Sequence, residues 1–101
     1  MNLASLATQA VAVVQGSGVP VLELIFFGSR VAGNERRNSD LDVAVDAGRP
    51  LTLAELSRLR EAFEESHLSV RVDLSDVRAL RPEFRAVALR GGMRRAVTPP
   101  E

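Results

Sequence analysis

The chain has 101 residues, of which 46% are hydrophobic and 26% charged, and thirteen basic and thirteen acidic residues give a formal net charge of zero. This composition is that of an ordinary globular chain, which excludes disorder and fibrous structure, and the length fits one small domain over residues 1–101. Zero net charge argues against a surface built to follow a long nucleic acid, because such binding depends on neutralising many phosphates.

All thirteen basic side chains are arginines, and the chain contains no cysteine. Without lysine, a Walker-type phosphate lysine, a Schiff base and a lysyl-nucleotide intermediate are excluded, and with them the ligase route to nucleotide transfer. Without cysteine, disulfides, thiolate nucleophiles and cysteine zinc sites are excluded as well.

The first expected element is an amphipathic helix over residues 3–15, in which apolar residues recur at helical spacing before Gly16. No basic residue precedes it, and Gln9 and Gln15 interrupt its apolar run, so a signal peptide is not expected. It is too short to span a bilayer, and we expect a cytoplasmic protein with no membrane contact.

A buried strand is expected over residues 19–27, and it stops at Gly28 and Ser29. A short helix over residues 29–33 would follow, and its free backbone N–H groups and dipole favour a bound phosphate. Gly28 has no Cβ atom, so the backbone can approach such a phosphate closely. This turn is therefore a candidate phosphate site.

A second strand, over residues 40–46, carries two carboxylates one residue apart, Asp40 and Asp42. Side chains at positions i and i+2 of a strand share one face, so these two point to one place. A third acid, Asp73, lies near the end of a further alternating segment over residues 69–74. Carboxylates gathered in this way suit a hard divalent cation such as Mg²⁺, which leaves coordination sites for phosphate and water.

The remaining elements are packing elements. Thr52 and Glu55 form a capping box for a helix over residues 53–66 with an apolar stripe at Leu53, Leu56, Leu59 and Phe63. His67 follows without a metal-spaced partner and is expected at the surface. Ser75 or Asp76 caps a short turn, and Asp76 is the one rival to Asp73 for the inward position.

A last helix is expected to begin at Pro82 and end at Gly91-Gly92, with Phe84, Val87 and Ala88 as its apolar side. Residues 93–97 form a short edge strand in this interpretation, and the remaining residues form a frayed tail.

Taken together, these segments resemble a known family. Gly28-Ser29-Arg30-Val31-Ala32-Gly33, then Ser39-Asp40-Leu41-Asp42, then Val72-Asp73-Leu74 are similar to the signature of the minimal nucleotidyltransferases (MNT) of the DNA polymerase beta superfamily. The resemblance covers roughly residues 20–92. It implies an α/β (α+β) nucleotidyltransferase fold, a small mixed sheet of three to four strands with helices on one side.

The resemblance also implies a division of roles among these residues. Asp40, Asp42 and Asp73 would be the catalytic and metal-binding residues, with two Mg²⁺ ions in the active complex. Gly28, Ser29, Arg30 and Ser39 would bind the nucleoside triphosphate, with ATP as the substrate and AMP as the transferred group. Arg36 and Arg37 lie near the acids in sequence, but solvated surface is the expectation for both.

Minimal members of the family are often antitoxins paired with a toxin of the HEPN class, so the resemblance implies a protein acceptor. Because the chain offers no second lobe, its acceptor site would come from a partner chain or a homo-oligomer. Two alternatives stay open: a non-catalytic module that neutralises a toxin by contact, and a transferase for small molecules such as antibiotics.

Overall fold

The computed structural model describes residues 2–27 and 40–98. In chain order the elements are α1 (Leu3–Ser17), β1 (Glu23–Phe27), β2 (Leu41–Asp46), α2 (Leu53–Glu65), β3 (Val72–Asp76), the 3-10 turn η1 (Val77–Ala79), α3 (Pro82–Gly91) and β4 (Met93–Ala96). Within these residues, no helix is long and apolar enough to cross a membrane.

The four described strands form one mixed sheet in the order β3-β2-β1-β4. Strand β1 is antiparallel to β2 and to β4, whereas β2 and β3 run parallel. A parallel pair needs a crossover connection, and α2 supplies it between β2 and β3. The expected small mixed sheet is therefore confirmed.

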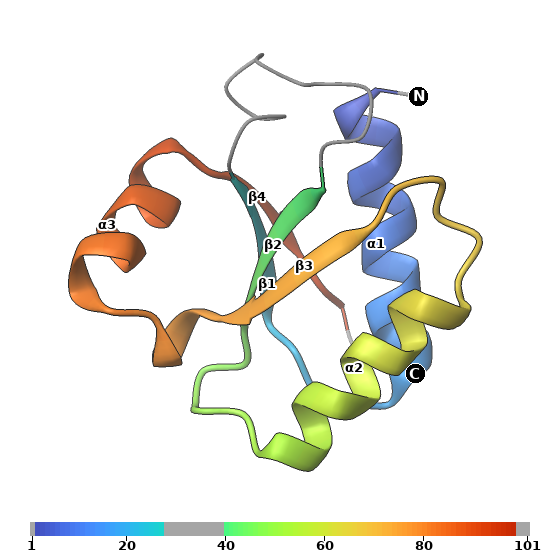
Figure 1. The fold of residues 1–101 in the computed structure, drawn as a ribbon, viewed down its shortest axis with the longest axis horizontal. Helices are drawn as coiled ribbons and strands as arrows, with labels where there is room; N and C mark the ends of the chain where they lie inside the picture. Colours follow the sequence, from blue (N-terminus) through green and yellow to red (C-terminus); the bar gives the residue numbers. More distant parts are fainter. Residues whose placement is uncertain (1, 28–39, 99–101) are drawn as a thin grey trace.

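Helices α1 and α2 cover one face of the sheet, and Figure 1 shows them together on the same side of the strands. The main hydrophobic core lies between them and the sheet. Its fully buried side chains include Leu6 and Val14 of α1, Phe26 of β1, Val43 of β2 and Leu59 of α2. Alternation along the strands sends every second side chain into this core.

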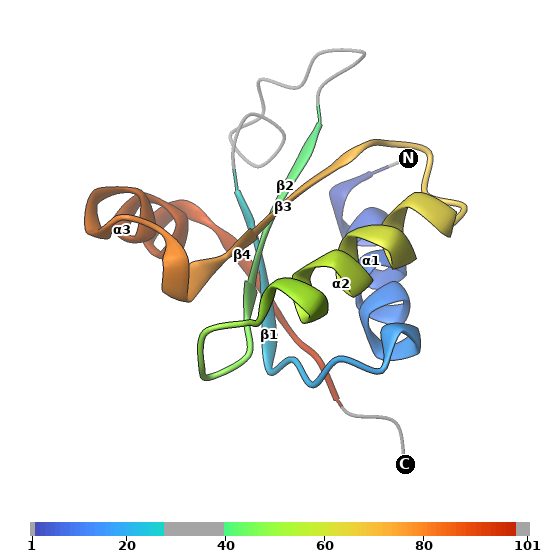
Figure 2. The same ribbon diagram turned by 60° about the horizontal axis from the view of Figure 1, so that its bottom comes forward.

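Helix α3 lies on the opposite face, as the turned view in Figure 2 shows. A smaller cluster of Ile25, Ala44 and Val77 is buried there, with Phe27 and Leu80 packed against it. Arg85 ties α3 to η1 by donating to the carbonyl oxygens of Val77, Arg78 and Leu80. The expectation that the helices share one side therefore holds for α1 and α2, and α3 departs from it.

Several element boundaries differ from the sequence-based ones. Helix α1 runs to Ser17 and not to residue 15. Strand β1 begins at Glu23 and not at residue 19, although Val19 and Val21 are buried. Pro20 lacks the N–H that ladder pairing requires, and backbone pairing begins only at Leu22, which donates to Asp46 O and accepts from Val97 N. Strand β3 runs from Val72 to Asp76, so Asp73 is its second residue and does not stand near its end.

Helices α1 and α2 have side-chain N-caps, and α1 ends at the cap Gly18 rather than near Gly16 as expected. Asn2 accepts from Ser5 N at the start of α1, and Gly18 ends that helix with a left-handed φ of 78°. Thr52 and Glu55 form the complete capping box of α2. Helix α3 begins at Pro82, as expected from proline's fit to the first helical turn.

The apolar stripes of two helices are only partly buried. Leu53 of α2 is 84% exposed, and Phe84 and Val87 of α3 are 60% and 66% exposed. Ala88 is buried, so α3 packs through that narrow side. The prediction that Phe84 and Val87 pack inward is therefore wrong, because α3 stands at the smaller face with no second layer over it in the described residues.

Candidate active site

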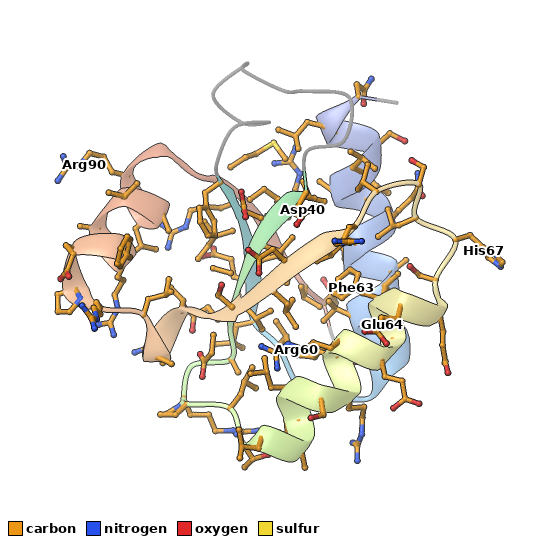
Figure 3. All side chains as sticks on the ribbon, in the orientation of Figure 1. Asp40, Arg60, Phe63, Glu64, His67 and Arg90 are labelled. Carbon is orange, nitrogen blue, oxygen red and sulfur yellow. The ribbon has the colours of Figure 1, made fainter. Side chains whose placement is uncertain are left out.

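Strand β2 positions the first two carboxylates. Leu41, Val43 and Val45 alternate into the main core, so Asp42 points to the opposite face, where α3 lies. Asp40 directly precedes Leu41, and the same alternation gives it the face of Asp42. Leu41 N donates to Arg71 O at 2.8 Å, so pairing with the neighbouring segment extends to this end of β2. Figure 3 labels Asp40 at that end.

Strand β3 brings the third carboxylate beside the pair. In the parallel register Asp42 pairs with Asp73, and Val43 pairs with Leu74. Since Val43 and Leu74 both enter the main core, Asp42 and Asp73 both point away from it. The two carboxylates, 31 positions apart in the sequence, are cross-strand neighbours on one face, as the sequence pattern predicts.

Asp76, the rival candidate, faces the other way. It pairs with Val45 and is buried on the core side of the sheet. Its carboxylate accepts from Leu51 N at 2.8 Å and from Arg78 N at 3.0 Å. Asp76 therefore holds the segment before α2 and caps η1, and the choice of Asp73 over Asp76 for the inward position is supported by the register.

The neighbouring carboxylates change the pKa of Asp42. Partial burial raises the pKa of Asp42, and the negative charges of Asp73 and Asp40 and a side-chain hydrogen bond with Asp73 raise it further. Each cause makes the ionised form less favourable. Asp42 therefore stands in a locally negative environment that a cation would relieve.

No ready-made metal centre stands among residues 2–27 and 40–98, because no three acidic, histidine or cysteine side chains there are gathered closely enough to hold an ion. The chemistry of the donors nevertheless fits Mg²⁺. Carboxylate oxygens on one face are the hard ligands that this ion takes, and Mg²⁺ usually needs only one or two of them beside substrate phosphates and water.

An apolar floor adjoins the carboxylates on the same face. Phe27 pairs with Asp42 across β1 and β2, and the next pair on the same face is Ile25 with Ala44. At the far end, Asp46 accepts from Arg78 Nε at 3.3 Å. Sequence reasoning missed this ion pair, although the period of two from Asp42 to Asp46 could have indicated a shared face.

The other predicted site residues fall into two groups. The first group lies outside the described residues. It consists of the expected helix over residues 29–33 and of Gly28, Ser29, Arg30, Arg36, Arg37 and Ser39. His67 is exposed, and Figure 3 shows it pointing away from the molecule beyond the end of α2, as expected.

The chain is similar to known nucleotidyltransferases. The family described as "Polymerase beta, Nucleotidyltransferase" matches residues 15–94, a span that contains all three carboxylates. A Haemophilus influenzae protein named "Probable protein adenylyltransferase MntA" is 44% identical over 69 residues, which is 68% of this chain. The match spans only 60% of the length of that relative.

Two solved structures are also similar. A chain assigned as a minimal nucleotidyltransferase is 37% identical, with a TM-score of 0.64, and the match covers 92% of this chain and 95% of that one. A chain from a crystal structure of a toxin–antitoxin with AMP-PNP has a TM-score of 0.72 at 23% identity, covering 93% of this chain and 73% of that one. At that identity the second likeness concerns the fold alone.

Proposed function

Since the chain belongs to the polymerase beta nucleotidyltransferase family, we propose that it is a Mg²⁺-dependent nucleotidyltransferase that moves AMP from ATP to a hydroxyl of a partner protein. In this proposal the partner is a HEPN-type toxin, and the modification makes the chain its antitoxin. The single observation that carries the proposal is the pairing of Asp42 with Asp73 on one face, beside Asp40.

Asp40, Asp42 and Asp73 would hold the metal. The raised pKa of Asp42 supports this assignment, because negative charge gathered without a cation is unfavourable. When bound, Mg²⁺ would supply positive charge to the phosphate oxygens and favour ionisation of the attacking hydroxyl. Gly28, Ser29, Arg30 and Ser39 would bind the triphosphate, as the family signature implies.

In the proposed transfer, one phosphorus–oxygen bond replaces another at the α-phosphorus of ATP. The hydroxyl oxygen of the acceptor forms a bond to the α-phosphorus of ATP, and the bond from that phosphorus to the bridging oxygen of the β-phosphate breaks. Pyrophosphate leaves with the electron pair of the broken bond, and Asp73 accepts the proton of the hydroxyl. Asp73 suits this role because its strand places it next to Asp42 on the open face.

A protein acceptor is supported by one similarity. The Haemophilus influenzae relative is named as a probable protein adenylyltransferase. Small-molecule transfer, such as antibiotic modification, lacks this support.

The test is incubation of the purified chain with labelled ATP, Mg²⁺ and the protein encoded by the neighbouring reading frame, once that frame is found to encode a HEPN-type toxin. We expect the label to enter the toxin, and Asp40→Asn to abolish the labelling. Asp46→Asn is the matched control, because it removes the same charge from the same face but at the other end of β2, which Arg78 occupies. Equal labelling by wild type and Asp40→Asn would overturn the proposed metal role.

The same variants separate catalysis from neutralisation by contact. If modification produces the antitoxin effect, Asp40→Asn binds the toxin but does not restore growth of cells that express it. If Asp40→Asn protects cells as well as wild type does, the chain acts as a binding module and the catalytic proposal for its biological effect fails.

A further inference from the structure

Helix α3 presents an uncovered apolar strip to solvent. Phe84 and Val87 lie one helical turn apart and are 60% and 66% exposed. The adjoining side of the helix packs inward, because Ala88 is buried and Arg85 donates to backbone carbonyls of η1. Exposed aromatic and branched side chains that are adjacent on a helix are typical of a protein contact. We call Phe84 and Val87 the α3 strip.

The α3 strip belongs to the same side of the sheet as the carboxylates. Asp42 and Asp73 point away from the core that α1 and α2 cover, toward the side on which α3 stands. An acceptor that offers a hydroxyl to these carboxylates must therefore lie over this side. Among the described helices, only α3 stands there to meet it.

The surroundings of the strip are positively charged. Residues 77–92 contain four arginines, at positions 78, 81, 85 and 90, against one acid, Glu83. Arg78 pairs with Asp46, and Arg85 is turned to backbone carbonyls. Arg81 and Arg90 are exposed, and Figure 3 shows Arg90 directed away from the sheet. Glu83 is exposed as well, so the rim of the strip carries two exposed arginines against one carboxylate and is net positive.

We propose that the α3 strip is the docking surface for the acceptor protein, and that it binds an apolar ridge flanked by acidic side chains. This inference rests on the proposed function, since it assigns the place where the acceptor of that reaction binds. Charge complementarity at the rim sets orientation and speeds encounter, whereas the buried apolar contact supplies most of the affinity.

The test is binding and labelling of the adjacent-gene toxin by the double variant Phe84→Glu/Val87→Glu. Binding is measured by calorimetry in an Asp40→Asn background, where no chemistry follows. We expect at least about thirtyfold weaker binding, the loss typical of removing an aromatic interface anchor. Labelling at a subsaturating toxin concentration should fall by a similar factor, while affinity for ATP measured without toxin stays unchanged.

Leu53→Glu is the matched control. Leu53 is 84% exposed on α2, on the other side of the sheet, so its change places a carboxylate at an open apolar site, one charge against the two of the double variant. It should leave toxin binding and labelling as in wild type. Circular dichroism and thermal unfolding check that both variants fold.

The outcomes separate the two proposals. Absence of labelling by wild type defeats the proposed function, whereas full labelling and binding by Phe84→Glu/Val87→Glu defeats the docking surface alone. Sedimentation of the chain without toxin tests a second occupant: a wild-type dimer that the double variant converts to a monomer would show that another copy covers the strip, and would overturn the assignment to an acceptor.

Discussion

Asp73 and Asp76 lie three residues apart on one strand and point to opposite faces of the sheet. Asp73 pairs with Asp42 on the open face, whereas Asp76 pairs with Val45 and is buried on the core side. An odd spacing in a strand always produces this reversal. The two aspartates therefore have separable effects, on chemistry and on stability.

Asp76→Ala should destabilise the fold by about 2–4 kcal/mol, because Leu51 N and Arg78 N both lose a charged acceptor near the protein interior. Urea unfolding measures this. Asp73→Ala is the paired variant, and it should abolish nucleotide transfer with unfolding free energy at or above that of wild type. A larger loss of stability in Asp73→Ala than in Asp76→Ala would contradict the assignment.

Asp42→Asn should stabilise the metal-free protein at neutral pH. The pKa of Asp42 is higher in the folded protein than its ordinary value of 3.8. The Asp42 side chain therefore favours folding most when the pH is below 3.8, and this stabilisation is lost as the pH rises through the pKa of the folded state. Asparagine carries no charge at any pH, so the gain over wild type should be near zero at pH 3 and grow toward pH 7. We expect less than about 1 kcal/mol, since solvent screens this partly exposed group.

The measurement is urea unfolding of both proteins in EDTA across this pH range. Asp46→Asn is the control, because Asp46 faces Arg78 rather than other acids and gains nothing from loss of its charge. A gain for Asp42→Asn that is largest at pH 3 would contradict the sign.

Addition of Mg²⁺ should raise the thermal midpoint of wild type, and EDTA should reverse the rise. Binding to the folded state alone stabilises by about 2.7 kcal/mol when the free ion is at a hundred times its dissociation constant. Asp73→Asn should lose this shift, because it removes one of the paired carboxylates. Differential scanning fluorimetry checks both proteins, and equal shifts would exclude Asp73 as a ligand.

Gly92→Ala should destabilise the protein by about 1–3 kcal/mol through overpacking. A Cβ atom there would meet the carbonyl oxygen of Ala88 and the Cγ2 atom of Ile25 well inside van der Waals contact, where the chain passes from α3 into β4. Gly91→Ala is the matched control, because nothing lies within 4 Å of its Cβ position. Thermal unfolding compares the two, and similar midpoints would show that the turn after α3 yields easily.

Thr52→Ala should lower the free energy of unfolding by about 1 kcal/mol, the usual loss of a helix N-cap, since Thr52 accepts from Glu55 N at the start of α2.

Glu55 accepts a hydrogen bond from Thr52 N and forms an ion pair with Arg49, and the hydrogen bonds of Glu55 with Arg49 and Thr52 lower its pKa to about 2. Its stabilising effect is present above the ordinary value of 4.5 and is lost as the pH falls through about 2. Urea unfolding of Glu55→Gln against wild type should therefore differ at pH 6 and converge near pH 2.

The sequence pattern predicted the parts of the fold that local chemistry determines. Alternation around Asp42 and Asp73 predicted both strands and their shared face, and the capping box at Thr52 marked the start of α2. The family resemblance is confirmed by the match over residues 15–94. Roles assigned to Gly28, Ser29, Arg30 and Ser39 stay predictions.

Long-range packing accounts for what the pattern missed. Apolar spacing in α3 predicted an inward face at Phe84 and Val87, but periodicity says nothing of whether a second layer covers a helix. The separation of α3 from α1 and α2 likewise depends on which sheet face remains open once the main core is filled. The pair of Asp46 with Arg78 joins residues 32 positions apart, and single-residue charge patterns do not reveal such partners.

The two sides of the sheet offer an engineer separate tasks. Substitutions within α1, α2 and the core beneath them can be chosen to raise heat tolerance, because that layer carries none of the three carboxylates. If the α3 strip binds the acceptor as proposed, substitutions on α3 can instead be selected for a new recipient protein. A library confined to one side should leave the property governed by the other largely intact, so this small scaffold lends itself to improvement in two independent rounds.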